Sequence, residues 1–242
     1  MIGTQRQTEI LEYIKKHQTI SIRQIVEKFY ISEATARRDL DALLKTGLVR
    51  RVFGGATLVE GSDKQVPLFV REREYEAEKD ALCRYASTFI QDGNILFLDG
   101  SSTVQFLLPY LKKFKELIVV TNGLKIARLL SEIHIKVYLA GGLLMENSSV
   151  LIGQDTEEFV GRFNADLCIL SCKGLSEDGK LTDTSYEETK LRKRYLENAK
   201  KKLVLMTSNK VGKKYIHTLC HADEVDHLLT TTLDGVTEWK KA

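Results

Sequence analysis

The sequence predicts an α/β protein in two parts, an N-terminal winged helix-turn-helix and a larger C-terminal domain built on a parallel β-sheet. Short helical segments near the N-terminus, followed by a β-branched, glycine-containing run at 48–55, indicate the first part. From Asn94 onward, apolar strands alternate with amphipathic helices, which is the pattern of a parallel sheet with helical crossovers. A chain of 242 residues has room for one small and one full-sized domain.

Composition bears on where the protein works. Hydrophobic residues make up 43% of the chain, as in ordinary globular proteins, but no apolar run approaches the ~20 residues of a membrane span. The first residues have no apolar segment of the kind found in secretory signals. We therefore expect a cytoplasmic protein that does not associate with membranes.

The cysteines form no C-x-x-C pair and have no histidines at metal-ligand spacing. This favours buried core thiols in a reducing compartment over a disulfide framework, and we predict neither a metal site nor a cofactor. Cys168 and Cys172 are four residues apart in an expected strand, hence on one face, so a redox role is the weaker alternative. The other two cysteines are Cys83 and Cys220.

The net charge of +3 is unevenly placed. Residues 1–58 carry ten Lys and Arg against six Asp and Glu, a net of +4, while the remainder carries 26 against 27, a net of −1. All of the basic excess thus lies where a module that contacts DNA phosphates needs it. A solvated basic surface would give the same count.

The helix-turn-helix is predicted from apolar spacing and capping residues. A first helix is expected over 5–17 with Thr4 as its N-cap, and Ser21 caps a second helix that turns Ile22, Ile25, Val26 and Phe29 inward. Tyr30-Ile31 makes the turn, and Ser32 caps the third helix. Two short helices joined by a tight turn behind a stabilising first helix form this motif.

The third helix has one apolar and one polar face. Ala36, Leu40, Leu43 and Leu44 should pack on the first two helices. The opposite face combines a small residue for close approach, a hydroxyl, and cations that can grip guanine or phosphate. The wing then adds arginines that could touch the flanking backbone, whereas Asp39 is better interpreted as structural, bridging an arginine. The predicted DNA-binding residues are Ser32, Ala34, Thr35, Arg37, Arg38, Lys45, Arg50 and Arg51. A solvated helix surface is the alternative for Arg37 and Arg38.

The domain boundary is predicted in a polar stretch. Val59–Pro67 is glycine-containing and ends in one of only two prolines, which is linker composition. We expect a DNA-binding domain over 1–58, a linker over 59–76 and a ligand-binding domain over 77–242. In the last, a helix is expected over 78–90, strands over 95–98, 117–120, 136–139, 167–170, 202–206 and 227–230, and helices over 103–111, 123–131, 156–163 and 186–199.

Small, hydroxyl-bearing or cationic residues follow each of the first five strands. In open α/β sheets, ligands bind at the carboxyl ends of the strands, and free backbone amides at helix starts suit phosphate. Lysines supply charge, while Asp99 and Glu188 could accept hydrogen bonds from sugar hydroxyls. The predicted effector-binding residues are Asp99, Gly100, Ser101, Ser102, Thr103, Thr121, Asn122, Gly141, Gly142, Lys173, Glu188, Arg192 and Lys210. The alternatives are ordinary glycine turns, a surface Lys210, and a plain i,i+4 pair of Glu188 and Arg192.

These motifs resemble a known family. T-x-R-R-D-L followed by L-x-x-x-G-L-V-R-R-x-x-G-G-A is similar to the N-terminal domain of DeoR-type bacterial transcriptional regulators, although Ala36 stands where that family commonly has a larger aliphatic residue. L-D-G-S-S-T, V-V-T-N, L-A-G-G, G-L-S-E-D-G-K-L-T and S-N-K-V-G resemble its effector domain. The resemblance implies a fold related to ribose-5-phosphate isomerase and a sensor of phosphorylated sugars. Departures at Thr207, Ser171-Cys172 and Arg192 bear on which effector is bound.

The sequence is compatible with three functions. The leading hypothesis is a repressor of a sugar-metabolism operon that binds double-stranded operator DNA as a homodimer or homotetramer and responds to a sugar-phosphate effector. The alternative is a sugar-phosphate isomerase-like enzyme with a fused DNA-binding module, but the strand-end loops contain no histidine and no compact acid/base motif, so no catalytic residue is assigned. An architectural DNA-binding protein would leave the polar strand ends unexplained.

Overall fold

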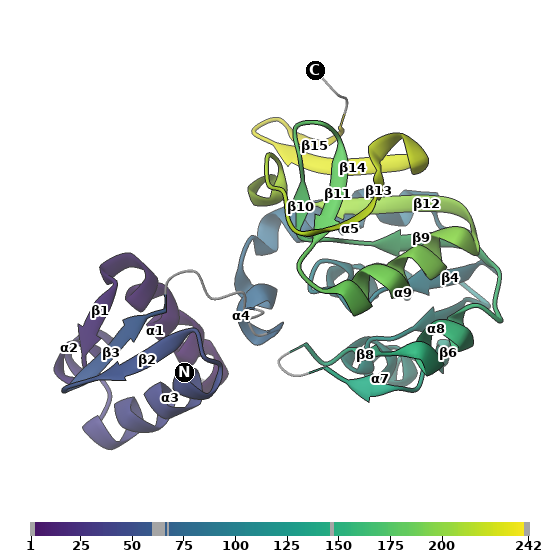
Figure 1. Cartoon of the computed structure of the whole chain (residues 1–242). Coiled ribbons are helices and arrows are strands. Elements are labelled where there is room, and N and C mark those ends of the chain that lie inside the picture. Colours follow the sequence, from purple (N-terminus) through teal and green to yellow (C-terminus); the bar gives the residue numbers. More distant parts are fainter. Residues whose placement is uncertain (1–2, 60–65, 67, 146–147, 240–242) are drawn as a thin grey trace. The chain divides into compact units, whose positions relative to one another are not determined.

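The computed structural model describes residues 3–59, 66, 68–145 and 148–239. The chain divides into two compact units, Met1–Glu74 and Tyr75–Ala242, and each is described by itself (Figure 1). Most of the predicted linker Val59–Pro67 lies outside the described residues. The boundaries 1–58, 59–76 and 77–242 stay a prediction.

The first unit is a winged helix-turn-helix, as predicted. Strand β1 pairs antiparallel with β3, and β3 pairs antiparallel with β2, which gives a small sheet in the order β1-β3-β2. The three longer helices pack their apolar faces into a core that includes Ile10, Ile14, Ile25 and Leu40. The elements are α1 (Gly3–His17), β1 (Thr19–Ser21), α2 (Ile22–Phe29), α3 (Glu33–Lys45), β2 (Val49–Val52), β3 (Gly55–Leu58) and α4 (Leu68–Arg73).

Local chemistry sets the helix ends in this unit. Ser21 forms a capping box with Gln24 at the start of α2, and Tyr30 ends that helix in the left-handed region, with φ +52°. Ser32 caps α3. The predicted cap at Thr4 is wrong, because α1 begins at Gly3 and Thr4 lies inside its first turn.

Helix α4 was not predicted, because its sequence is short and highly charged. Leu68 and Val70 are nevertheless buried, and Val70 joins the core of the winged helix-turn-helix. The Lys15 ammonium lies 2.7 Å from the Glu74 carboxylate, which adds an ion pair between α1 and the residue that follows α4. Residues 68–74 therefore belong structurally to the first unit.

The second unit is a three-layer α/β fold around a seven-stranded sheet (Figure 1). Its strand order is β15-β14-β12-β9-β4-β5-β6; the pair β14–β15 is antiparallel and the other neighbours are parallel. The main strands are β4 (Ile95–Leu98), β5 (Ile118–Thr121), β6 (Lys136–Leu139), β9 (Ala165–Leu170), β12 (Ala199–Met206), β14 (His227–Thr232) and β15 (Gly235–Glu238). The helices are α5 (Glu76–Ala86), η1 (Ser87–Phe89), η2 (Val104–Leu107), α6 (Leu108–Leu111), α7 (Leu124–Glu132), α8 (Gln154–Val160), α9 (Tyr186–Glu197), η3 (Ser208–Lys210) and η4 (Ala222–Glu224).

Alternating side chains on β4 divide the core in two. Leu96 and Leu98 face a cluster that includes residues of α5 and α7, whereas Phe97 faces a cluster that includes residues of α8 and α9. The Phe97 ring lies 5.1 Å from the fully buried ring of Tyr195, measured between centroids. The parallel strands are therefore buried on both faces, which explains their continuous apolar sequences.

The remaining differences from prediction lie in short segments. The helix expected over 103–111 is the 3-10 helix η2 followed by the short α6, because Pro109 near the start of α6 lacks an amide hydrogen. Cys172 lies beyond the end of β9 rather than in it. Strands of small hairpins were also missed: β7 (Leu143–Leu144), β8 (Leu151–Ile152), β10 (Gly174–Leu175), β11 (Lys180–Asp183) and β13 (His217–His221).

Candidate functional site

Helix α3 presents its polar face to solvent from a fixed start. The Ser32 hydroxyl accepts a hydrogen bond from the Thr35 amide at 3.2 Å and lies 3.0 Å from the Thr35 hydroxyl. Ala34 and Arg38 are exposed, whereas Ala36 on the opposite face is fully buried. The residues predicted to meet DNA therefore lie on the accessible side of the helix.

Asp39 anchors α3 to α1, as its structural interpretation predicted. Its buried carboxylate accepts hydrogen bonds from Arg6 Nε at 2.5 Å and from Gln7 Nε2 at 3.2 Å. The hydrogen bond to Asp39 raises the pKa of Arg6 above its ordinary value, although burial acts in the opposite direction. The pair fixes how α3 projects from the unit.

The predicted DNA-contacting cations fall into two groups. Arg37 pairs with Glu33 at 2.5 Å and Arg51 pairs with Asp41, so these guanidinium groups are held near the surface of α3 and the wing. Within the described part of the chain, Arg38, Lys45 and Arg50 form no ion pair, and all three are exposed. The second group is thus the more available for phosphate or base contacts.

The wing is the β2–β3 hairpin. Gly54 turns it with φ +74°, and Phe53 beside it is fully exposed. A Cβ atom at Gly55 would lie 2.0 Å from the Ile20 carbonyl oxygen, so only glycine lets β3 approach β1. The hairpin is therefore held against the helices while its turn stays accessible.

The loop after β4 lies in the middle of the sheet's carboxyl edge. A Cβ atom at Gly100 would come within 2.2 Å of Val150 Cγ1, so this position requires glycine. The Gly100 amide donates to Asn122 Oδ1 at 3.1 Å, and the Ser101 hydroxyl accepts from the Val104 amide at 3.3 Å. Within the described residues, the nearly buried Ser102 hydroxyl forms no hydrogen bond.

Arg192 is buried beneath this loop among acidic side chains. Its guanidinium donates to Asp99 at 3.0 Å, to Asp183 at 2.7 Å and to Glu188 at 3.1 Å. Burial acts to lower the pKa of Arg192, but the charges of Glu188, Asp183 and Asp99 outweigh it and raise the pKa well above its ordinary value. One positive charge therefore faces three carboxylates, and the cluster as a whole is acidic.

Lys210 joins the carboxyl ends of three adjacent strands. It ends η3 after β12, and its Nζ donates to the Ser171 hydroxyl after β9 at 2.7 Å and to the Thr103 hydroxyl after β4 at 3.5 Å. Removal of this ammonium from water lowers the pKa of Lys210 to about 8. Hydroxyls and a half-buried ammonium thus meet at one point of the sheet edge.

The other predicted effector residues surround these groups. Lys173 Nζ donates to the Thr184 hydroxyl at 2.5 Å. The Thr121 hydroxyl accepts from the Gly123 amide at 3.0 Å, and Asn122 Nδ2 donates to the Leu151 carbonyl at 3.0 Å. These side chains shape the loops, in addition to any role toward a ligand.

Two family models match the chain. The model described as the DeoR-like helix-turn-helix domain matches residues 6–61, and the model described as the DeoR C terminal sensor domain matches residues 74–232. The second match alone covers more than half of the chain. The chain belongs to the DeoR family of transcriptional regulators. The family predicted from the sequence motifs is thereby confirmed, as is the DNA-binding helix-turn-helix.

Relatives of known name match over almost the full length of this DeoR-family chain. The glycerol-3-phosphate regulon repressor of Escherichia coli (strain K12) is 30% identical over 231 residues, 95% of this chain and 91% of that protein. The HTH-type transcriptional regulator GolR of Listeria innocua is 30% identical over 242 residues, 100% of this chain and 95% of its own. The HTH-type transcriptional repressor GlcR of Bacillus subtilis is 30% identical over 234 residues, 96% and 90% of the two chains.

A solved structure confirms the predicted fold of the C-terminal part. A D-ribose-5-phosphate isomerase in complex with phospho-erythronic acid matches with a TM-score of 0.50 and 12% identity, over 68% of this chain and 98% of that chain. At this identity the likeness shows the fold alone. The sensor domain of this DeoR-family protein therefore shares its architecture with a sugar-phosphate enzyme.

Sequence reasoning on the DeoR sensor domain left out several residues of the site. Asp183 was missed because it ends the short hairpin strand β11, and Thr184 follows it. Ser171 was identified as a strand-end residue but not as an effector-binding residue, although its hydroxyl makes the shorter of the two hydrogen bonds of Lys210. In contrast, the Gly141 carbonyl accepts from the Thr156 hydroxyl of α8 at 2.6 Å, and Gly142 packs on the same side chain. The ligand role of this pair stays a prediction.

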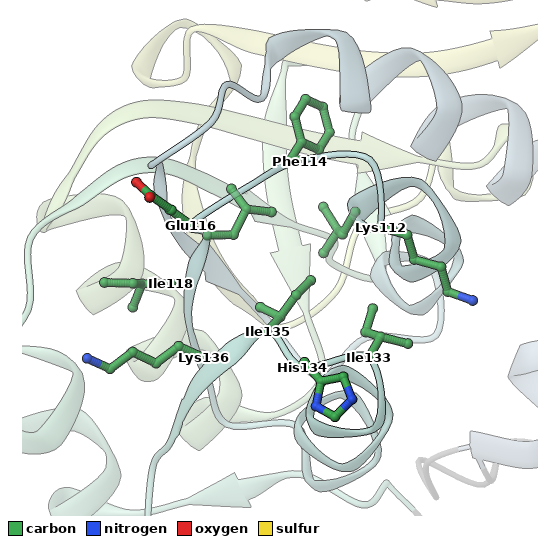
Figure 2. A pocket seen from close by; sticks show the side chains of 10 residues that line it. Lys112, Phe114, Glu116, Ile118, Ile133, His134, Ile135 and Lys136 are labelled. Carbon is green, nitrogen blue, oxygen red and sulfur yellow. The ribbon is translucent and has the colours of Figure 1, made fainter.

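A separate depression lies at the opposite edge of the sheet, where β5 and β6 begin (Figure 2). Phe114, Ile133 and Ile135 form its apolar part, and Lys112 and Lys136 stand at its rim. It contains none of the hydroxyl-rich strand-end loops. This depression is therefore distant in the fold from the groups that suit a phosphate ester.

The cysteines are buried, and none is poised for redox chemistry. Burial raises the pKa of Cys172 to about 12 and that of Cys220 to about 12, and it raises the pKa of Cys83 and Cys168 as well. Thiols with raised pKa carry little thiolate at neutral pH and react slowly. The structure gives the redox alternative no support.

Proposed function

We propose that this chain represses a sugar-related operon and that a phosphorylated sugar or a related metabolite controls its DNA affinity. The observation that carries the proposal is the meeting of Lys210 with the Thr103 and Ser171 hydroxyls at three adjacent strand ends of a sensor domain. The accessible cations of α3 and the wing would form the surface that binds operator DNA. The names of the E. coli and B. subtilis relatives, both repressors, support this assignment.

The charges at the site favour one orientation of the effector. The Arg192 cluster carries three carboxylates and one guanidinium, and it would repel a phosphate dianion. Two like charges 4 Å apart repel by about 4 kcal/mol near a protein surface. We therefore place the phosphate over Ser102 and Lys210, and the sugar hydroxyls toward Asp99 and Glu188, whose oxygens can accept hydrogen bonds.

An isomerase reaction fits the same loops less well. Both oxygens of Asp99 already accept hydrogen bonds, from Arg192 and from the Ser101 amide, and both oxygens of Asp183 are bonded as well. A general base must be within reach of the substrate proton and able to take it. Because Arg192 holds these carboxylates, we propose effector recognition and no turnover. Measurable isomerisation that Glu188→Gln abolishes would revive the enzyme.

We further propose that the protein acts as a homodimer or homotetramer on an operator with repeated half-sites. A single basic module binds DNA weakly and with little discrimination at cellular salt. Leu143 and Leu144 on hairpin strand β7 are 71% and 52% exposed, and Leu124 at the start of α7 is 44% exposed. An apolar group of this kind suits a second copy of the chain.

Among the described helices, none is long and apolar enough to cross a membrane, and the proposed site of action is the cytoplasm.

A thermal-shift screen tests the effector assignment. The purified protein would be heated with a panel of sugar phosphates, glycerol 3-phosphate, inorganic phosphate and the unphosphorylated parent sugars. We expect at least one phosphorylated compound to raise the melting temperature, because a ligand that binds only the folded state stabilises it. Mobility-shift assays with operator DNA then show whether that compound weakens DNA binding. A stabilisation by unphosphorylated sugars alone would contradict the phosphate site.

A further inference from the structure

Glu78, in the first turn of α5, holds the turn that carries Lys210. Its Oε2 accepts a hydrogen bond from the Ser208 amide at 2.8 Å, and its Oε1 accepts one from the Ser208 hydroxyl at 2.8 Å. The Thr231 hydroxyl also donates to Oε2. Ser208 begins the 3-10 helix η3 that ends at Lys210. Glu78 therefore fixes the start of this turn from 130 residues away in the sequence.

The same helix also contacts the loop after β4. Cys83 Sγ donates to the Thr103 carbonyl at 3.1 Å, and the buried Lys79 places its Nζ 5.7 Å from the centre of the Phe106 ring in η2. Thr103 is one of the two hydroxyl partners of Lys210. Helix α5 thus touches both loops that meet at the Lys210 ammonium.

Helix α5 follows the winged helix-turn-helix unit almost directly in the chain. Only Glu74 and Tyr75 separate it from α4, the last helix of the winged helix-turn-helix unit. Helix α5 is therefore the first element of the sensor unit. A displacement of its start acts directly on the chain that leads to the DNA-binding unit.

The Glu78 carboxylate is ionised at neutral pH and accepts hydrogen bonds from Ser208 and Thr231. Partial burial acts to raise the pKa of Glu78, but the hydrogen bonds from Thr231 and Ser208 outweigh it and lower the pKa below its ordinary value. Hydrogen bonds to a charged group are about twice as strong as neutral ones. Three charge-assisted hydrogen bonds therefore link α5 to the 208–210 turn and to Thr231.

We propose that Glu78 is a positioning residue that couples occupancy at Lys210 to helix α5. This inference rests on the proposed function, because it needs an anion to bind at Lys210. A phosphate oxygen that takes over the hydrogen bonds of Lys210 from Ser171 and Thr103 changes the constraint on the 208–210 turn. Glu78 passes that change to α5, and by linkage the state of α5 alters the affinity for the anion.

Hydrogen exchange on the full-length protein tests the coupling, with inorganic phosphate as the probe. In the wild type, saturating phosphate should slow exchange about tenfold both in loop 100–107 and in α5, as a typical coupling free energy implies. In Glu78→Gln, the loop should still be slowed, but α5 should change less than about twofold. Glu76→Gln, which removes the same charge from an exposed site on the same helix, should behave like the wild type.

A second variant keeps the test valid if Glu78→Gln does not fold. Ser208→Ala removes one hydroxyl bond and leaves the amide bond to Glu78, so the response of α5 should fall only in part. If α5 is slowed in Glu78→Gln and Ser208→Ala as in the wild type, or if only the loop responds in the wild type, the coupling is overturned while the phosphate site stands. If loop 100–107 does not respond in the wild type, the proposed phosphate site itself fails.

Discussion

The pH dependence of effector binding should follow the protonation of Lys210. The folded protein lowers the pKa of Lys210 to about 8, below the ordinary lysine value, so the ammonium needed for an anion is fully present only below that pH. The protonated fraction is about 0.9 at pH 7 and about 0.1 at pH 9. A phosphate monoester, with a second pKa of about 6, is already a dianion across this window. The effector affinity should therefore fall about tenfold between pH 7 and pH 9.

Isothermal titration calorimetry of the effector found by the screen would measure this fall. Titrations in buffers of different ionisation enthalpy should also show proton uptake on binding near pH 8.5, because the anion raises the pKa of the lysine. Lys210→Arg keeps a charge at every pH in this window, so its profile should be flat. Lys210→Met should bind weakly and also show a flat profile. A wild-type affinity that is constant from pH 7 to pH 9, or an equal fall in Lys210→Met, would refute the role of this lysine.

Four further changes test the rest of the molecule. Arg38→Ala should weaken operator binding about tenfold to a hundredfold in mobility shifts and leave the effector affinity unchanged, and an unaltered operator affinity would count against α3 as the recognition helix. Ser102→Glu should place a carboxylate where we put the phosphate, so that DNA binding no longer responds to the effector; a normal response would exclude this placement. Asp39→Ala removes the buried carboxylate that accepts hydrogen bonds from Arg6 and Gln7 and should cost about 1.5–3 kcal/mol of unfolding free energy in urea, whereas the exposed Asp41→Ala should cost less than about 1 kcal/mol; equal losses would contradict the anchor. Leu143→Glu should convert the proposed oligomer to smaller species in sedimentation velocity, and a wild-type protein that is monomeric at all concentrations would disprove the proposed oligomer.

Sequence alone predicted those features whose causes are local. Ser21 and Ser32 were identified as caps because the hydroxyl and the amide it binds are three residues apart. The main parallel strands were found from continuous apolar runs, since each is buried on both faces. Helix α4 was missed because its charged residues hide the apolar Val70, which is buried in a core that includes residues of α1. Burial that another element creates leaves no periodic signal in so short a segment.

The candidate site was predictable in its residue types but not in its pairings. Asp99, Glu188 and Arg192 were all chosen from the sequence, yet the sequence suggested only the i,i+4 pair of the last two. Asp99 lies 93 residues from Arg192 in the sequence. Asp183 lies in a hairpin that the apolar pattern of the sequence does not predict. The sheet order brings them together, because β4 pairs directly with β9 although β5 to β8 lie between these two strands in the sequence. Contacts of this kind become visible only when the strand order is known.

Under the proposed function, the separation of charge within the candidate site gives effector selection and signalling to different groups of one loop cluster. The acidic cluster around Arg192 is buried, and each carboxylate oxygen of Asp99 and Asp183 accepts at least one hydrogen bond. Lys210, in contrast, is half-buried on a short 3-10 turn, and among the described residues its Nζ donates to two uncharged hydroxyls. An arriving phosphate would therefore gain charge-assisted hydrogen bonds at Lys210, and Lys210 stands on the turn that Glu78 holds. Under the proposed function, the acidic cluster would orient the ligand and Lys210 would carry the signal to Glu78.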